Sequence, residues 1–477
     1  MHKDPISLLM GFYFSPRGGS AHACRAIATE LERHGVDVKL LSGSRRDLGA
    51  HADANRFFAG HDLAVVDFTD SVRARSPLRH DSGPGCAPIH ASYEDRPGAE
   101  DPVFASLDDE AFERQVEAWR RALAGSGAGQ AEMLYLHHLT PINEAAARAY
   151  PDLPVLGHIH GSELLMLERI ASDPRPDWPH AERWVERLCG WAAACEKIVV
   201  NSPDGRRRAA RLLDLDPERF ILIPNGFDPS FAPRPGDRRA LWARHLVDRP
   251  QGWRPGGTPG SVRYAPAELA PLEGTTLLYS GRFTEVKRLK LLIEAYAAAR
   301  PGFRTVTALV LLGGFPGEWE GEHPAETIAR LGLDDVFIAG WHEQSALPDF
   351  LNAADVMVHA SVREQFGQVL VEGMACRVPP IAVDRGGPAG IVDNGRSGWL
   401  VEPDDADALG EAMLEAVNDP AGRRARGTAA RGEAERRYTW RAIGAALAGE
   451  LREIEASAGD AHPPAAGGVR PVLSPGS

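Results

Sequence analysis

Short apolar segments alternate with amphipathic stretches along the first half of the chain. Apolar runs that end in polar or glycine-containing turns are typical of buried parallel strands. We assign such strands to residues 6–14, 36–41, 63–66, 133–136, 155–159, 197–201 and 220–223. Before the fourth of them, Phe112, Val116 and Trp119 have the spacing of one helical face. The alternation predicts an α/β domain with a doubly wound sheet.

The second half repeats this pattern after a stretch, residues 234–274, that is dense in Pro, Gly and Arg. Strands are expected at residues 276–280, 305–312, 336–339, 356–358 and 398–401, with a Pro-rich strand before Gly386. Because 477 residues exceed the size of one hydrophobic core, two domains are expected. We place an N-terminal domain at 1–225, a linker at 226–273 with an inserted loop at 248–272, and a C-terminal domain at 274–430. A helix at 431–457 is expected to cross back to the first domain, and residues 458–477 form a Pro- and Gly-rich tail expected to be disordered.

The composition argues against several functional classes: nucleic-acid-binding, membrane-spanning and structural-zinc proteins. A net charge of −13 makes a nucleic-acid partner unfavourable, and no apolar run approaches the ~20 residues that span a bilayer. The five cysteines are scattered and form no metal-binding spacing, which indicates reduced thiols and a cytoplasmic location without structural zinc. The abundance of Arg, Ala, Gly and Pro is typical of a GC-rich bacterial genome.

The most informative stretch lies between residues 355 and 403. Glu364 and Glu372 stand eight residues apart, with Phe366–Gly367 after the first and Gly386–Gly387 downstream. Glu364 lies in a loop that follows a short buried strand, and Glu372 lies within the next helix. Both carboxylates are therefore expected in one crevice at the carboxyl end of a parallel sheet, where α/β domains bind ligands.

This ordered set resembles the C-terminal signature of retaining nucleotide-sugar glycosyltransferases of family 4, which have the GT-B fold of two Rossmann-like domains facing a cleft. The resemblance spans most of the chain and is strongest from 276 to 403. It implies transfer of a sugar from a UDP- or GDP-type donor to a small soluble hydroxylated or glycosidic acceptor. No protein nucleophile, metal or other cofactor is implied, and we identify no Asp-x-Asp metal site. The oligomeric state stays open, with a homodimer as one alternative.

The resemblance also implies roles for individual residues. Arg282 and Lys287 would stabilise the diphosphate, Glu364 would hold the sugar hydroxyls, Glu372 would bind the ribose, and His160 would lie near the donor sugar. The remaining nucleotide and donor contacts would be Gly18, Gly19, Gly281, Phe337, Phe366, Gly367, Gln368, Val369 and Leu370.

The acceptor side is less defined. His137 and His138 follow a strand of the first domain, and Tyr93, Asp95 and Arg96 lie in a long polar segment between 71 and 109. A connection of that length is usually functional or disordered. We interpret it as a mobile flap that contacts the acceptor, with a disordered insertion as the alternative.

Three positions depart from the family pattern: Gly390 replaces a usual Glu, Gly373 a usual Ala, and Arg377 a common Gly. Two functional alternatives stay open within the fold: a catalytically silent binding subunit, and an enzyme that acts at a membrane surface on a lipid or polysaccharide acceptor. A nucleotide-sugar epimerase or a phosphorylase of related fold is a further alternative, although we identify no cofactor-binding lysine for the latter. The basic cluster at 206–211 lacks an apolar face, which favours the soluble acceptor.

Overall fold

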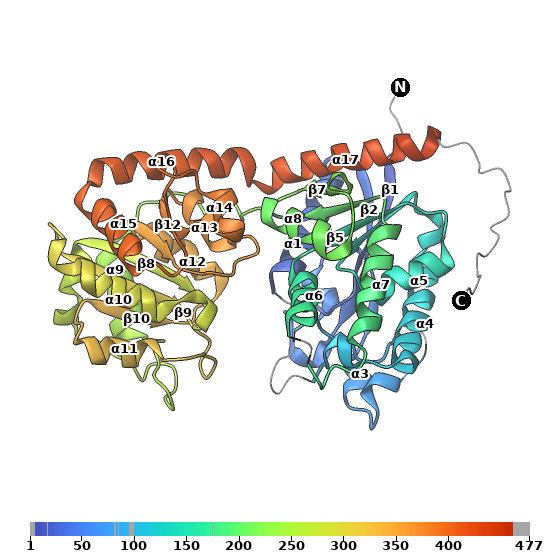
Figure 1. Ribbon diagram of the computed structural model, residues 1–477, viewed down its shortest axis with the longest axis horizontal. Helices are drawn as coiled ribbons and strands as arrows, with labels where there is room; N and C mark the ends of the chain where they lie inside the picture. Colours follow the sequence, from blue (N-terminus) through green and yellow to red (C-terminus); the bar gives the residue numbers. More distant parts are fainter. Residues whose placement is uncertain are drawn as a thin grey trace, which may run out of the picture.

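The computed structural model describes residues 5–16, 18–80, 83, 85–94, 100–173 and 175–460. Two lobes lie side by side, and two helices run along one edge of both (Figure 1). Among the described residues, no helix is both long and apolar enough to cross a bilayer. Asp95, Arg96 and residues 461–477 of the expected tail lie outside the described residues.

The N-terminal lobe is built on a parallel sheet whose strand order is β3-β2-β1-β4-β5-β6-β7. All the strands that the apolar pattern predicts in this half are present. They are β1 (Ile6–Phe12), β2 (Val36–Ser44), β3 (Asp62–Asp67), β4 (Met133–His137), β5 (Val155–Ile159), β6 (Lys197–Val200) and β7 (Phe220–Leu222).

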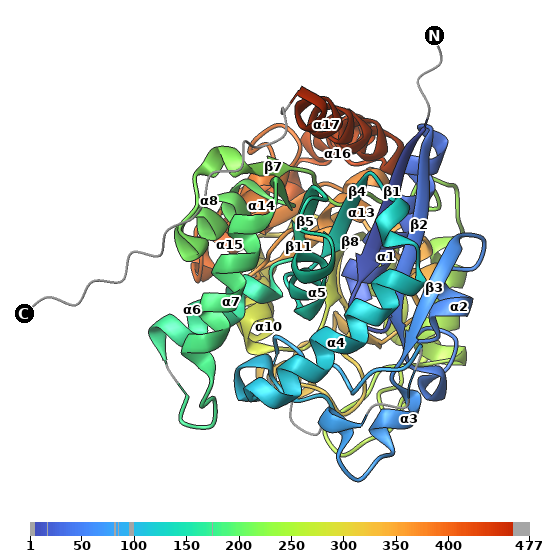
Figure 2. The same ribbon diagram turned by 90° about the vertical axis from the view of Figure 1, so that its right-hand side faces the viewer.

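Helices cover both faces of this sheet. The α-helices are α1 (Gly18–Arg33), α2 (Ala54–Phe57), α3 (Thr69–Val72), α4 (Asp109–Gly125), α5 (Pro141–Ala149), α6 (Ser162–Ser172), α7 (Ala181–Ala194) and α8 (Pro203–Leu213). Short 3-10 turns are η1 (Arg46–Leu48), η2 (Pro77–Arg79), η3 (Phe104–Ser106), η4 (Ala128–Gln130) and η5 (Pro217–Arg219). In Figure 2, α4, α5 and α7 cover the face turned to the viewer. There Trp119 and Trp184 are fully buried, so aromatic packing anchors that core.

The C-terminal lobe repeats the arrangement with the parallel order β10-β9-β8-β11-β12-β13. Its strands are β8 (Thr275–Gly281), β9 (Thr307–Gly313), β10 (Val336–Gly340), β11 (Val356–His359), β12 (Pro380–Val383) and β13 (Trp399–Val401). Its α-helices are α9 (Arg238–Ala243), α10 (Leu289–Ala299), α11 (Pro324–Leu331), α12 (Leu347–Asn352), α13 (Gln368–Ala375), α14 (Gly386–Ile391) and α15 (Ala406–Asn418). Short turns are η6 (Arg244–Asp248), η7 (Pro266–Glu273), η8 (Glu285–Lys287), η9 (Arg300–Gly302) and η10 (Gln344–Ala346). Two doubly wound domains confirm the predicted fold class.

The segment between the lobes is packed onto the C-terminal domain. Trp253 is 1% exposed and donates its indole N–H to the carbonyl of Gly314 over 2.9 Å. The Tyr264 hydroxyl accepts a hydrogen bond of 2.8 Å from the Ile338 amide, at the edge strand β10. The inserted loop expected at 248–272 therefore covers a sheet edge and joins the core.

The C-terminal crossing consists of two helices, α16 (Pro420–Arg437) and α17 (Trp440–Asp460), where a single helix was expected. The break at Tyr438 lies beside the first crossing of the chain, because the Phe227 amide donates to the Tyr438 carbonyl over 2.9 Å. Figure 1 shows α16 along the C-terminal lobe and α17 along the N-terminal lobe. Leu447 of α17 is buried in the same core as Ile27 of α1, so this helix packs onto the first domain.

Candidate functional site

The strand order of each sheet reverses at one point, between β1 and β4 in the first domain and between β8 and β11 in the second. Ligands of open α/β sheets bind in the crevice at the carboxyl ends of such strands. Gly18, His138 and His160 follow β1, β4 and β5, while Arg282 and Glu364 follow β8 and β11. The topology thus gathers most of the predicted residues at two strand-end crevices.

Glu364 is the centre of the C-terminal crevice. Its Oε2 atom accepts a charge-assisted hydrogen bond from the Lys287 ammonium and lies 3.0 Å from Nε2 of His359. Burial alone would raise the pKa of Glu364, but the bond to His359 and the charge of Lys287 outweigh it and lower the pKa to about 2. The carboxylate is therefore ionised at neutral pH and held by two donors.

Arg282 stands at the mouth of the same crevice. The loop that carries it is anchored because Phe283 is buried and the Tyr279 hydroxyl donates to the Arg282 carbonyl over 2.6 Å. The Arg282 side chain is exposed, and within the described chain it forms no ion pair. A guanidinium on an anchored loop is thus available for an anionic ligand.

Helix α13 presents the second carboxylate. Gly367, which precedes it, has φ +105°, a conformation that favours glycine. Gln368 in its first turn donates to the Gly226 carbonyl over 2.8 Å and to Oε1 of Glu372 over 3.3 Å. Glu372 is 4% exposed, and burial raises its pKa to about 7. Its protonation state therefore changes near neutral pH.

The two glycines downstream brace the loop between the carboxylates. The Gly387 amide donates to the Glu364 carbonyl over 2.9 Å. A Cβ atom on Gly386 would lie 2.6 Å from that carbonyl, so this close backbone approach requires glycine. Gly390, where the family has Glu, packs against Pro203, whose Cδ would lie 3.1 Å from a Cβ atom. This departure coincides with a contact between α14 and α8.

Four residues that are predicted to contact the donor have side chains that lie in the hydrophobic core or pack against it. Phe337 is fully buried in β10, and the base contact that the resemblance implies there is one of backbone groups near the end of the strand, which a buried side chain does not exclude. Phe366 and Leu370 are buried, and Val369 packs against the same core. The Leu370 amide donates to Gly367, so it is not free for a phosphate. Sequence spacing located these positions but not the directions of their side chains.

The first domain contributes a glycine pair at the start of α1. A Cβ atom on Gly18 or Gly19 would meet no atom within 4 Å. Gly18 has φ +69°, which favours glycine, whereas nothing in the described structure requires glycine at 19. The pair leaves open space above the amino end of α1, where amide groups lack acceptors.

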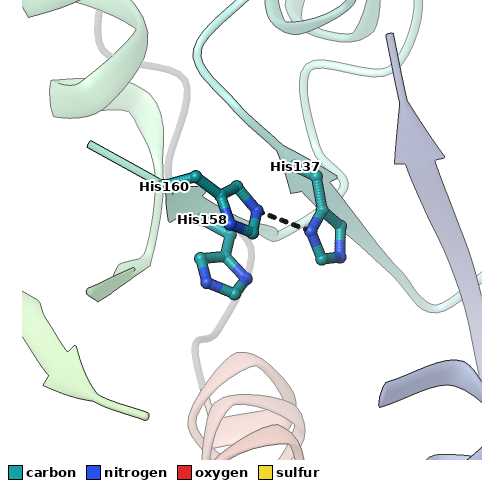
Figure 3. A group of neighbouring side chains, drawn as sticks. All are labelled: His137, His158 and His160. Carbon is teal, nitrogen blue, oxygen red and sulfur yellow. Dashed lines mark hydrogen bonds between the residues drawn. The ribbon is translucent and has the colours of Figure 1, made fainter. Parts of the chain in front are cut away.

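A cluster of histidines lies at the carboxyl ends of β4 and β5. Nδ1 of His137 is 2.9 Å from Nε2 of His160, and Nδ1 of His138 is 2.6 Å from the buried carboxylate of Glu163 (Figure 3 shows the first pair). His158 stacks under His160 with ring centroids 4.0 Å apart. His137 and His138 are buried, and only His160 of these is partly exposed. The side chains of the two predicted acceptor histidines are therefore buried, and each lies against the ring of His160.

The long segment is not a flap in its described parts. Tyr93 is 3% exposed, donates its hydroxyl to the Leu139 carbonyl, and packs on Phe104 with ring centroids 4.7 Å apart. Phe104 is itself fully buried in the main core of the domain. The predicted acceptor role of Tyr93 is thus wrong for its side chain, because apolar residues spaced along a polar segment fold it into the core.

The two domains touch at the site. Arg208 of α8 donates to Gln365 over 2.7 Å and forms a two-point ion pair with Glu168. A cavity of about 420 Å³ lies here between the domains. It is lined by Glu168, Asp204, Arg208, Arg211, Val286, Val362, Arg363, Glu364, Arg385 and Gly386.

Sequence reasoning missed three residues of this site. His359 ends the strand β11 and bonds to Glu364, and its position as a polar residue closing a buried strand was the available signal. Glu163 is completely buried and accepts the Gly161 amide over 3.0 Å in addition to His138. Gln365 gave no signal, because a single amide side chain in a loop has no pattern.

Two family models match the chain. The model described as Glycosyltransferase Family 4 matches residues 17–231, and the model described as Glycosyl transferases group 1 matches residues 263–433. The first match contains β2 to β7 and begins after β1, and the second match contains all six strands of the C-terminal sheet. Most of the segment that joins the two sheets lies outside both matches.

Curated relatives include a D-inositol 3-phosphate glycosyltransferase 2 of Catenulispora acidiphila, 30% identical over 234 residues, or 48% of this chain and 49% of the relative. A D-inositol 3-phosphate glycosyltransferase of Kribbella flavida is 26% identical over 412 residues, covering 83% and 85%. The alignments with the first relatives span about half of those proteins' length.

Among solved structures, sucrose-phosphate synthase from Thermosynechococcus elongatus superposes with a TM-score of 0.64 at 20% identity over 95% of this chain and 100% of that chain. The Anabaena protein HepE in complex with UDP gives 0.62 at 17% identity over 94% and 100%. At these identities the likeness concerns the fold.

Proposed function

Since the chain belongs to glycosyltransferase family 4 and has the GT-B fold, we propose that it transfers a sugar from a UDP- or GDP-type donor to a small hydroxylated or glycosidic acceptor, with retention at the anomeric carbon. The observation that carries this proposal is the contact between Lys287 and Glu364 beside the exposed Arg282. Two cations and an ionised carboxylate follow the strands at which the order of one sheet reverses. This combination of charges suits the binding of a diphosphate that is joined to a sugar.

The bond that breaks joins the anomeric carbon to the diphosphate oxygen, and its electrons leave with the diphosphate. Arg282 and Lys287 would stabilise that developing charge, which is electrostatic catalysis without a metal ion. The acceptor hydroxyl forms the new bond from the same face, and its proton goes to the departing phosphate oxygen. Glu364 would accept hydrogen bonds from sugar hydroxyls, and Glu372 from the ribose. His160 would contact the donor sugar from the other domain.

Lys287 would exchange its partner during this cycle. In the structure its ammonium is bound to Glu364, and its side chain is only 14% exposed. A diphosphate carries more charge than one carboxylate, so donor binding would draw Lys287 partly away. Glu364 would stay ionised because His359 still holds it.

For the acceptor, we propose a phosphorylated polyol as the first class to test. The relatives named above act, by their names, on D-inositol 3-phosphate. In this chain the interdomain cavity carries four arginines, and Arg363 and Arg385 have no carboxylate partner in the described structure. Their guanidinium groups would suit a phosphate next to Glu364. No disulfide links the cysteines in the described part of the chain, which fits a cytoplasmic enzyme.

The proposal is tested by a panel of UDP, GDP, ADP and TDP in thermal unfolding, followed by turnover with the matching nucleotide sugar. A ligand present at 100 times its Kd stabilises the native state by about 2.7 kcal/mol. Product NMR then reports the anomeric configuration, and an inverted product would overturn retention. A catalytically silent subunit would bind a nucleotide without hydrolysing or transferring from any donor.

A further inference from the structure

Three histidines from two neighbouring strands converge in the first domain (Figure 3). His137 ends β4, His158 lies in β5, and His160 follows β5. One ring nitrogen from each lies within 4.8 Å of the others. Side chains two apart on a strand point to the same side, which explains why His158 and His160 stack.

The hydrogen bonding within this group is incomplete. Nε2 of His158 is buried and has no partner in the described structure. A buried ring nitrogen without a partner loses its hydrogen bond to water and gains none in return. Three adjacent imidazoles without a carboxylate among them thus form an unsatisfied polar group, and an ion could complete it.

From this convergence we propose that His137, His158 and His160 bind a zinc-like divalent transition-metal ion. Imidazole nitrogens suit zinc, copper, nickel and iron, whereas magnesium and calcium prefer oxygen ligands. Three protein ligands with one open position describe a zinc site that is accessible to solvent, and the partial exposure of His160 gives that access.

The geometry requires moderate adjustment. With bonds of about 2.0–2.1 Å, two nitrogens of a tetrahedral zinc site stand about 3.3 Å apart. The Nδ1 atom of His137 and Nε2 of His160 are already 2.9 Å apart, so a metal ion would replace their hydrogen bond. The widest of the three separations must shorten, which side-chain rotation can supply. A neutral imidazole supplies the lone pair for each bond to the metal ion.

The surroundings supply an outer partner for one ligand. The Tyr135 hydroxyl lies 2.7 Å from Nδ1 of His158, opposite the unpartnered Nε2 atom. A hydrogen bond on the far nitrogen of a metal-binding histidine orients the ring and selects the tautomer. Tyr135 is therefore a positioning residue for the ion.

The ion would not take over the proposed role of Arg282 and Lys287 at the diphosphate, because these two residues belong to the other domain. It would engage the ring of His160, which the proposed reaction assigns to the donor sugar. Micromolar zinc is therefore expected to inhibit transfer, and this inhibition should disappear together with metal binding.

The test is a titration of the metal-free full chain, prepared without a polyhistidine tag, with Co²⁺ as a spectroscopic probe and then Zn²⁺ as competitor. We expect one ion per chain and visible absorption typical of four-coordinate Co²⁺. His158→Gln and His160→Gln should abolish it, and Tyr135→Phe should weaken binding about 10- to 100-fold. The exposed His51→Gln controls for adventitious surface binding.

Near-ultraviolet circular dichroism establishes that each variant is folded. If His158→Gln does not fold, the partly exposed His160→Gln decides the question. Absence of stoichiometric Co²⁺ or Zn²⁺ binding to the wild-type chain would overturn the proposal. Unchanged binding in folded His160→Gln would also overturn it, and unchanged affinity in Tyr135→Phe would contradict the role of that hydroxyl.

Discussion

Gly161 and Gln365 belong to different domains, yet a Cβ atom on Gly161 would lie 2.7 Å from the Gln365 side chain. Gly161 has φ +106°, and the turn that contains it links His160 to the buried Glu163. Gln365 follows Glu364 and accepts a hydrogen bond from Arg208. The approach of the two domains at the site therefore depends on the absence of a side chain at residue 161.

Gly161→Ala should lower both stability and turnover. The left-handed backbone costs an alanine about 1–2 kcal/mol, and the added methyl group separates Gln365 from the first domain. Gly332→Ala is the matched control, because Gly332 also has positive φ (+63°) but has open space around it and caps the carboxyl end of α11. Denaturant unfolding should show losses for both variants, and initial rates should fall only for Gly161→Ala. Equal rates in the two variants would contradict the cleft contact.

Glu372→Gln should change the pH dependence of stability. The folded pKa of Glu372 is raised to about 7 from a usual 4.5, mainly by burial, so the folded protein binds the proton more tightly than the unfolded chain. This contribution to stability is full below about pH 4.5 and is lost as pH rises through about 7. It amounts to about 3 kcal/mol, since each pKa unit corresponds to 1.36 kcal/mol.

The Glu372→Gln side chain does not titrate, so the variant should not lose this contribution to the free energy of unfolding. Urea unfolding should therefore show that its stability rises relative to wild type between pH 5 and 8. If the Glu372 carboxylate binds the ribose, nucleoside diphosphate affinity should fall in the variant above about pH 7, and the difference from wild type should shrink at lower pH. Parallel stability profiles of the two proteins would contradict the raised pKa. Equal nucleotide affinity would contradict the ribose contact.

Tyr93→Phe should reduce stability without altering acceptor kinetics. The variant keeps the packed ring but leaves the Leu139 carbonyl without its donor, a loss of about 1–3 kcal/mol for a buried acceptor. The free energy of unfolding and the acceptor KM are to be measured on the same preparation. A raised KM with unchanged stability would restore the acceptor role.

The strands and their order of appearance were predictable because each buried parallel strand is a short apolar run bounded by turns. The spacing of Glu364, Phe366–Gly367 and Gly386–Gly387 could also be recognised in the sequence. The close backbone contacts between Gly386–Gly387 and Glu364 give a physical reason for that spacing. Arg377 illustrates the same logic: it has φ +65° where the family has a common Gly, so the position requires a left-handed backbone.

Side-chain directions and long-range contacts were not predictable. Tyr93 looked like a polar loop residue, but its ring is enclosed by Phe104 and other aromatic side chains that lie distant in sequence. The break between α16 and α17 depends on the Phe227–Tyr438 hydrogen bond, and no local propensity encodes a partner more than two hundred residues away. The histidine cluster likewise arises only when β4 and β5 pair.

The central claim is that Arg282 and Lys287 stabilise a departing diphosphate. Once the panel has identified the donor, initial transfer or donor-hydrolysis rates should be compared among wild type, Arg282→Ala, Lys287→Ala and the control Lys290→Ala. Lys290 lies close to Lys287 in the sequence, in the first turn of α10, but its ammonium forms an ion pair with Glu322 at 3.0 Å. We expect a loss of about 100- to 1000-fold in the first two variants, with folding intact, and a rate near wild type in the control. Near-normal rates in Arg282→Ala and Lys287→Ala would contradict it.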